Sequence, residues 1–180
     1  MKRIETDRLI LRQWNECDTD DLFEYASDPE VGPNAGWKPH TSREESEQII
    51  RMFIEKDDVW AIESKEDGKV IGSVGLHTDR RREGINARML GYVLHRNYWG
   101  RGLMTEAARR TVRYAFEELN ADVLSVYHYT FNERSKRVIE KCGFHYEGTI
   151  RMAGRLFNGT VVDDVCYSIL KDEYFSRQPQ

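Results

Sequence analysis

Apolar positions recur along two long segments with the period of an α-helix. In residues 103–119 they return every three or four positions, with arginine side chains opposite, which predicts an amphipathic helix. Residues 42–54 show the same spacing behind a capping box at residues 42–45, in which a serine precedes a glutamate by three positions. Both segments therefore predict helices that bury one face.

Two shorter helices are predicted behind residues that cap helix starts. Asp18 precedes the first, which ends before Pro29, and Asn132 precedes the second, which Gly143 stops. Residues 28–39 hold three prolines and two glycines, so they are predicted to form a loop.

Runs rich in β-branched and aromatic residues predict strands between these helices. An Asp-Gly turn at residues 65–68 joins two of them, and the last two flank Asn158-Gly159, which predicts a type I′ hairpin turn. The strands joined by the Asp-Gly turn are expected at residues 59–64 and 69–77, and further strands at residues 8–13, 87–94 and 123–129. Without repeats or a linker, this alternation predicts one mixed α/β domain over residues 1–180.

The composition fits a folded domain in water. The chain has 180 residues with 39% hydrophobic and 11% aromatic side chains, too many for a disordered chain. No apolar stretch approaches the roughly 20 residues that span a bilayer, and the first residues are charged, unlike a signal peptide. Three cysteines without a C-x-x-C spacing favour reduced thiols. These features predict a cytoplasmic protein.

The charge is unevenly distributed. A net charge of −4 argues against a general nucleic-acid binder, which would be clearly basic. Residues 13–37 hold seven acidic residues and neither lysine nor arginine, so this segment carries −7 and the rest of the chain +3. A solvated helix face explains such a run, and an acidic wall beside a cation site is the alternative. The three arginines of residues 80–82 are interpreted as solvated loop charge.

The turn Gly100-Arg101-Gly102 stands between a predicted strand and the long helix. A helix N-terminus has unpaired N–H groups and a partial positive charge, and glycines let a phosphate approach the backbone. The turn differs from two common phosphate motifs, because no G-K-[ST] follows and the third glycine of the dinucleotide fingerprint is missing. A plain tight turn is the alternative.

The order of several short segments along the chain is more informative than any one of them. Residues 6–12, 70–77 and 91–94 precede Tyr98-Trp99-Gly100-Arg101-Gly102, and residues 105–107, 132–135 and 140–148 follow it. This order resembles the GNAT superfamily of acetyl-CoA-dependent acetyltransferases, in the branch similar to ribosomal-protein alanine N-acetyltransferases. The resemblance covers residues 6–174. It implies a single α/β (α+β) domain whose mixed, mostly antiparallel sheet of about six to seven strands is flanked by about four helices.

The resemblance also implies acetyl-CoA as the acetyl donor, without a metal. The family's pyrophosphate loop falls on residues 97–102, with Asn97 in place of the usual glutamine or arginine. The strand before it would line the pantetheine arm, and residues 132 and 135 match the family's Asn and Ser near the sulfur. The implied cofactor-binding residues are Tyr92, Val93, Leu94, Asn97, Trp99, Gly100, Arg101, Gly102, Leu103, Met104, Asn132 and Ser135.

Amine acetylation requires a proton acceptor for the amine and benefits from a donor to the departing thiolate. Ser135 is the candidate donor. Many relatives carry a glutamate two residues before the Gly-Tyr pair of this strand, and here that position is Met89, which cannot take a proton. His77 and Glu106 are therefore the candidate acid-base residues, with Asp164 as a further choice, and a structural role is the alternative for each.

The absence of this glutamate affects which acceptor amine can be deprotonated. With pKa values of about 7.8 for an α-amine and 10.4 for lysine, deprotonation at pH 7 costs about 1.1 and 4.6 kcal/mol respectively. This difference favours a peptide N-terminus or an amino-acid-like amine over a lysine side chain or a polyamine. With the resemblance to ribosomal-protein acetyltransferases, the α-amine of a protein or peptide N-terminus is the predicted acceptor. A small-molecule amine (an antibiotic, polyamine or amino acid) is one alternative, and a non-catalytic acyl-CoA-binding module is another.

In the family, the region between the first strand and the second helix walls the acceptor site, and here it contains the acidic segment. The candidate substrate-binding residues are Trp37, His40 and Met89, although tethering of the loop also explains Trp37 and His40. The expected partner is an amine-bearing acceptor, with no membrane and no direct nucleic-acid contact, and a homodimer is left open.

Overall fold

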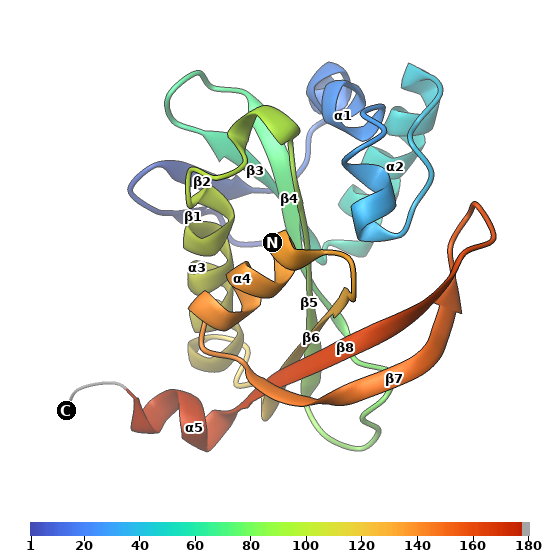
Figure 1. The fold of residues 1–180 in the computed structure, drawn as a ribbon. Helices are drawn as coiled ribbons and strands as arrows, with labels where there is room; N and C mark the ends of the chain where they lie inside the picture. Colours follow the sequence, from blue (N-terminus) through green and yellow to red (C-terminus); the bar gives the residue numbers. More distant parts are fainter. Residues whose placement is uncertain (178–180) are drawn as a thin grey trace. The chain divides into compact units, whose positions relative to one another are not determined.

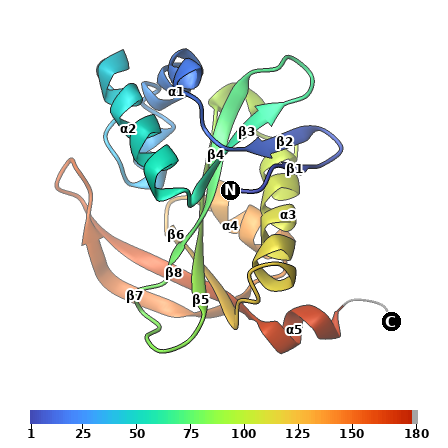
Figure 2. The same ribbon diagram turned by 180° about the vertical axis from the view of Figure 1, so that it is seen from behind.

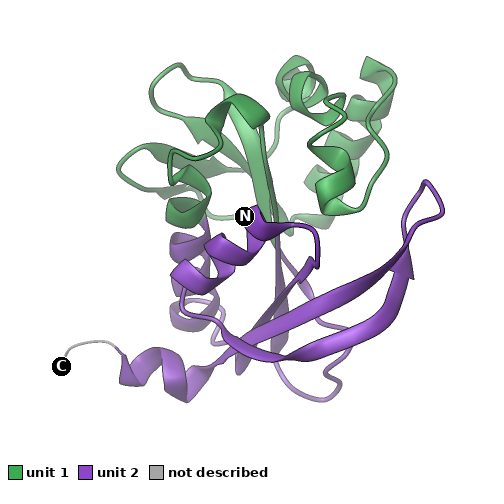
Figure 3. Ribbon diagram, in the orientation of Figure 1, with its two compact units in different colours: residues 1–75, 92–107 green, residues 76–91, 108–180 purple. Residues whose placement is uncertain are grey.

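A computed structural model of the chain describes residues 1–177 (Figure 1). The chain divides into two compact units: residues 1–75 and 92–107 form the first, while the second begins with residues 76–91 and resumes at residue 108 (Figure 3). Three elements run from one unit into the other: β4 (Val70–Thr78), β5 (Ala87–Leu94) and α3 (Leu103–Glu117).

The first unit contains an antiparallel ladder. Its strands follow in the order β1 (Ile4–Glu5), β2 (Leu9–Arg12), β3 (Val59–Ser64) and β4. Leu9 and Leu11 are fully buried and alternate with less buried residues, as expected for a strand with one face in the core. Every residue of β3 except Glu63 is buried, so this strand contributes to the core along its length.

The helices of the first unit are α1 (Thr19–Ala26) and α2 (Arg43–Lys56), which lie side by side (Figure 2). Short 3-10 turns precede each of them at Glu16–Asp18 and Gly32–Ala35. A hydrophobic cluster holds this part of the unit together, and its buried members are Trp14, Leu22, Tyr25, Ala26, Val31, Ile50, Ala61 and Val70.

Two predicted helix starts differ in outcome. Ser42 caps α2 as predicted, because its hydroxyl accepts the Glu45 N–H at 3.3 Å. The reciprocal bond goes elsewhere, since the Glu45 carboxylate accepts the Thr41 N–H at 2.8 Å. Asp18 is the N-cap residue of α1, as predicted, but its side chain makes no capping hydrogen bond to that helix. Its buried carboxylate accepts Arg12 and the Asn15 N–H instead, so it is engaged by residues that precede the helix.

In the second unit the strands follow in the order β5, β6 (Val123–Tyr129), β8 (Val161–Leu170) and β7 (His145–Arg155). β5 and β6 are parallel and pair over three positions, of which the last is Met89 with Ser125. The helices are the second part of α3, α4 (Glu133–Lys141) and α5 (Lys171–Ser176). Asn132 caps α4 through the Ser135 N–H at 3.1 Å, and Gly143 follows its end with φ +82°, both as predicted.

The hairpin between β7 and β8 departs from its prediction. A type I′ turn needs positive φ at both central residues, but among residues 1–177 outside glycine only Asp57, Asn120 and Met152 have positive φ. Gly159 has φ +87°, and its N–H donates to the Leu156 carbonyl at 2.9 Å. The loop is therefore a type I turn followed by a left-handed glycine, which is a wider connection than the predicted one.

A β-bulge interrupts β7 near its middle. The register shifts between Ile150 and Gly154, and Met152 has φ +53°. The Met152 N–H donates to the Asp163 carboxylate at 2.8 Å. This strand is the last in the order, so the bulge lies on the edge of the sheet.

The predicted fold class is confirmed. The sheet is mixed and mostly antiparallel, and residues 1–177 contain eight strands and five α-helices. The strands at 59–64, 87–94 and 123–129 have the predicted bounds. The two-residue β1 and the short α5 were not predicted, because neither is long enough to show a period. A single domain over residues 1–180 stays a prediction. Within residues 1–177, every helix is too short or too polar to cross a membrane.

Candidate active site

The glycine turn of the first unit connects a 3-10 turn (Arg96–Tyr98) to α3. Gly100 and Gly102 have φ values of +75° and +77°, in the left-handed region that other residues rarely adopt. A Cβ at Gly100 would meet nothing within 4 Å, and one at Gly102 only Arg8 Nη2 at 3.7 Å. Backbone conformation, not lack of space, therefore requires glycine here. The first N–H groups of α3 have no acceptor within the helix, so the turn has the backbone arrangement that binds phosphate.

Side chains of the first unit hold this turn in place. Trp99 Nε1 donates to the Leu94 carbonyl at 2.7 Å, and the Asn97 N–H donates to His95 Nδ1 at 3.0 Å. Arg8 Nη1 donates to the Arg101 carbonyl at 2.9 Å. The predicted cofactor-binding residues 92–104 thus form one continuous, braced segment. It comprises the end of β5, the 3-10 turn, the glycine turn and the start of α3.

The Arg101 side chain is engaged outside the turn. Its guanidinium forms an ion pair with Glu66 and lies over the Tyr98 ring, 5.4 Å from the centroid. The Tyr98 hydroxyl in turn donates to the Asp67 carboxylate at 2.5 Å. We therefore expect Arg101 to contribute its backbone, not its guanidinium, to a bound phosphate.

Glu106 lies in the first turns of α3, and its oxygens are occupied. They accept the Thr6 hydroxyl at 2.6 Å, the Arg8 N–H at 2.9 Å and Arg8 Nε at 2.7 Å. Burial raises the pKa of Glu106, but the hydrogen bonds from Thr6 and Arg8 outweigh it and bring the pKa below its usual value. A carboxylate held ionised in this way favours the structural alternative over the acid-base role.

Trp37 and His40 tether the loop before α2. The Trp37 ring packs against the hydrophobic cluster and closely over Gly32, where a Cβ would lie 2.7 Å from the ring. It also lies 5.4 Å from the His40 ring, whose Nδ1 is 2.8 Å from Ser46 Oγ. Burial lowers the pKa of His40. These contacts support the tethering alternative, and a substrate-binding role stays a prediction.

Most of the acidic side chains of residues 13–37 are paired within the first unit. Five of the seven carboxylates form ion pairs with basic side chains outside this segment, at distances between 2.5 and 3.7 Å. These pairs are Glu16–Arg51, Asp18–Arg12, Asp20–Arg43, Glu24–Lys69 and Glu30–Arg96. The arrangement supports a solvated face over an acidic wall for cations.

In the second unit, Ser135 stands in the first turn of α4, where Asn132 holds its backbone N–H. His77 lies on β4 with its ring against Gly91, where a Cβ would be 3.1 Å from Nε2. A larger residue at position 91 would therefore push the His77 ring aside.

A hollow of about 360 Å³ opens in the second unit near the end of the parallel ladder. Met89 lines it, together with side chains from the loop after β4 and from β6, β7 and β8. The other lining residues are Asp79, Arg81, Arg82, Ser125, Val126, Tyr127, Glu147, Gly148, Thr149, Ile150, Cys166 and Tyr167.

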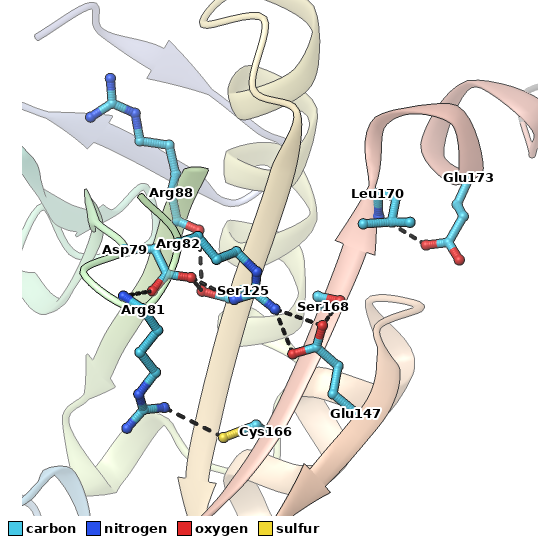
Figure 4. A network of polar contacts seen from close by, with 10 residues as sticks. All are labelled: Asp79, Arg81, Arg82, Arg88, Ser125, Glu147, Cys166, Ser168, Leu170 and Glu173. Carbon is cyan, nitrogen blue, oxygen red and sulfur yellow. Dashed lines mark hydrogen bonds and ion pairs between the residues drawn. The ribbon is translucent and has the colours of Figure 1, made fainter. Parts of the chain in front are cut away.

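A polar network crosses this hollow (Figure 4). Asp79 is buried and accepts the Ser125 hydroxyl at 2.8 Å and Arg82 Nη1 at 2.6 Å. Arg82 Nη2 lies 2.6 Å from both oxygens of Glu147, which also accepts the Ser168 hydroxyl at 2.8 Å. Burial raises the pKa of both carboxylates, but the serine and arginine donors outweigh it, so both pKa values lie below their usual range.

Arg81 makes a second set of contacts beside this network. Its Nη2 lies 2.5 Å from the Asp164 carboxylate, and its Nη1 lies 3.4 Å from Cys166 Sγ. The guanidinium also lies over the Tyr127 ring, 5.4 Å from the centroid. The interpretation of residues 80–82 as solvated charge is therefore incomplete for Arg81 and Arg82. Arg81 is exposed but forms an ion pair with the buried Asp164 of β8, and Arg82 bridges the buried Asp79 and Glu147 of β7.

Sequence reasoning missed most of this network. The sequence indicates Asp164 only as a candidate base and Glu147 only as part of the segment 140–148, and no pattern points to Asp79 or Ser125. Their sequence separations of about 20 to 85 residues produce no local motif. The one available signal was a lone acid or serine inside a strand of β-formers, as in residues 123–129. Within residues 1–177, no group of three or more His, Cys, Asp or Glu side chains is arranged to hold a metal ion.

Comparisons with known proteins agree with this geometry. Residues 8–145 match the family described as acetyltransferase (GNAT) domain. The uncharacterized N-acetyltransferase YoaA of Bacillus subtilis is 33% identical over 177 residues, which cover 93% of this chain and 96% of YoaA.

Two solved structures share the fold. An acetyltransferase of the GNAT family from Bacillus anthracis has a TM-score of 0.86 at 23% identity, covering 96% of this chain and 100% of its own. The ribosomal-protein-S5-alanine acetyltransferase from Vibrio fischeri has a TM-score of 0.79 at 23% identity, covering 99% and 100%. The family match spans most of the chain and YoaA is related over nearly all of it, so this chain belongs to the GNAT family of N-acetyltransferases.

Proposed function

We propose that this protein transfers the acetyl group of acetyl-CoA to the α-amine of a protein or peptide N-terminus. One observation carries the choice of acceptor. The two carboxylates that line the hollow with Met89, Asp79 and Glu147, both accept hydrogen bonds from Arg82 and from a serine, and these donors lower their pKa values. A carboxylate in that state is a weak base, so the acceptor must lose its proton readily.

The glycine turn fits the coenzyme. Gly100 and Gly102 leave open space where side chains would stand, and the first N–H groups of α3 follow directly. We expect the backbone of residues 100–104 to hold the diphosphate and residues 92–94 to line the pantetheine arm. When bound, acetyl-CoA supplies an acetyl thioester that an amine can attack.

The protein's own residues then have three tasks. Met89 and its neighbours in the hollow exclude water around the amine. The ionised carboxylates attract the protonated amine and let it reach the site. Ser135, held in the first turn of α4 by Asn132, donates a hydrogen bond to the leaving sulfur.

The difference in deprotonation cost between the two kinds of amine favours an N-terminal α-amine over a lysine side chain as the acceptor. At pH 7 the deprotonation of lysine costs about 3.5 kcal/mol more than that of an α-amine, which corresponds to a factor of several hundred in the reactive species. The name of the Vibrio fischeri protein, ribosomal-protein-S5-alanine acetyltransferase, agrees with an alanine N-terminus as a first acceptor to test.

Two peptides of one sequence test the proposal. One has a free α-amine and an acetylated lysine, and the other has a blocked N-terminus and a free lysine. Mass spectrometry after incubation with acetyl-CoA should show acetylation of the first peptide, at least 100-fold faster than of the second. Faster acetylation of the lysine would overturn the choice of acceptor. Acetylation of small amines alone would replace it with the small-molecule alternative.

A further inference from the structure

The charged side chains that line the hollow of the second unit, together with Asp164 beside it, include more acidic than basic groups. Three carboxylates, those of Asp79, Glu147 and Asp164, face two guanidinium groups, those of Arg81 and Arg82. The net charge of this group of five side chains is −1. Partly buried charge is screened less than surface charge, so the hollow attracts a further cation.

The two arginines are held with different strength. Arg82 lies between two carboxylates, and its side chain is 21% exposed. Arg81 has one carboxylate partner and is 45% exposed, whereas that partner, Asp164, is 8% exposed. The buried member of this pair is fixed in β8, and the exposed member comes from the loop after β4. Arg81 is therefore the cation that can leave.

Removal of Arg81 would leave a site with a defined chemical preference. Asp164 would be a buried carboxylate without its ion-pair partner, which is strongly unfavourable until another cation replaces it. The Tyr127 ring beside it offers an aromatic face, which attracts planar cations such as guanidinium. Cys166 Sγ adds a soft, weakly polar wall.

We propose that Asp164 and Tyr127 form a cation subsite for a basic side chain of the acceptor, and that Arg81 fills this subsite until the acceptor displaces it. The inference rests on the proposed function, because it assigns the acceptor's chemistry. It selects N-terminal peptides with arginine, or less strongly lysine, close to the reacting amine. Arg81 already shows the geometry that such a side chain would adopt.

Arginine amide and citrulline amide are matched probes for the subsite, because they have nearly the same shape and the same α-amine, and only the arginine side chain is charged. Isothermal titration of each into Arg81→Ala, without acetyl-CoA, should give at least a 10-fold lower Kd for arginine amide than in the wild type. The Kd for citrulline amide should not change. Asp164→Asn in the same background should remove the difference between the probes.

The adjacent, exposed Arg80 provides the matched control, since Arg80→Ala also removes one positive charge from the loop. It should leave both Kd values at the wild-type level. Equal tightening for arginine amide in Arg80→Ala and Arg81→Ala would overturn the subsite, because the effect would then be general electrostatics. If Arg81→Ala does not fold, Arg81→Gln supplies the same test with a polar side chain.

The binding test separates this inference from the proposed function. Binding of arginine amide that depends on Asp164, without acetylation of any peptide N-terminus, would support the subsite and contradict the proposed function. Acetylation of Ala-Arg and Ala-citrulline peptides with the same kcat/KM, in wild type and in Arg81→Ala, would support the proposed function and contradict the subsite.

Discussion

The two units hold their candidate functional groups in different ways. In the first unit the candidate phosphate site consists of backbone, with two left-handed glycines and the start of α3. In the second unit the candidate groups are side chains, with five charged groups and two serines in and beside a hollow. A backbone site depends on a few conformations, whereas a side-chain site depends on many partners. The two should therefore respond differently to substitution.

The largest effect is expected at the glycine turn. Gly102→Val should raise the Kd for acetyl-CoA at least 100-fold, because a β-branched residue opposes φ +77° and its side chain enters the phosphate site. Isothermal titration measures this directly.

Gly68→Val is the matched control for that variant. Gly68 has φ +72° and open space around it, but it lies in the turn between β3 and β4. Its valine variant should lose stability and keep its affinity for acetyl-CoA. A similar loss of affinity in both variants would mean that strain, not the phosphate site, explains the result.

The second effect concerns the buried network. Asp79→Asn should lower the free energy of unfolding by about 3 kcal/mol, since it breaks a buried ion pair and removes one of the two carboxylate partners of Arg82. Asp20→Asn removes the same group from an exposed pair with Arg43 and should leave stability within experimental error of the wild type. Urea unfolding of both variants compares them. Equal losses would show that burial does not distinguish the two networks.

A smaller effect on rate is expected at α4. Ser135→Ala should lower kcat roughly 10-fold, the value of one hydrogen bond to a charged leaving group, and leave the Kd for acetyl-CoA unchanged. Ser176→Ala, in α5, serves as the control and should match the wild type in both quantities. A rise in Kd without a change in kcat would place Ser135 in donor binding alone.

The smallest effect is a pH dependence of stability. Because the folded-state pKa of Glu147 lies below that of the unfolded chain, its ionised form stabilises the fold above about pH 4.3, and this contribution is lost as the pH falls through the folded pKa.

Glu147→Gln should remove that part of the acid dependence. Between pH 7 and 3 its unfolding free energy should fall by about 0.5 kcal/mol less than that of the wild type, a small amount because Glu147 is 39% exposed. Glu133→Gln, at an exposed pair on α4, should follow the wild-type curve. Identical curves for all three proteins would show that Glu147 does not titrate with folding.

The difference between the backbone groups of the first unit and the side-chain groups of the second also explains what could be predicted from sequence. The glycine turn was visible because its residues are adjacent and its conformations demand glycine. The same holds for the strand at 59–64 and for the Asn132 cap, where local chemistry decides local structure.

Interactions between distant residues decided the points that were missed. Asp18 is the N-cap residue of α1, but its carboxylate binds Arg12 and the Asn15 N–H and not the first amides of that helix. Arg81 and Arg82 belong to a hydrophilic loop, yet they form ion pairs with Asp164 on β8, with Glu147 on β7 and with Asp79 after β4. Five of the seven acids in the conspicuous run at 13–37 are paired with basic side chains, while three acids that are scattered in the sequence meet in one network with two arginines.

The bulge in β7 has a consequence for the protein in solution. This edge strand exposes Tyr146, Ile150 and Met152, a pattern that invites another chain to add as a further strand. The left-handed Met152 breaks the regular spacing of edge amides, and Asp163 occupies its N–H. An incoming strand would lose its ladder there after a few residues. The bulge therefore limits aggregation through this apolar edge strand.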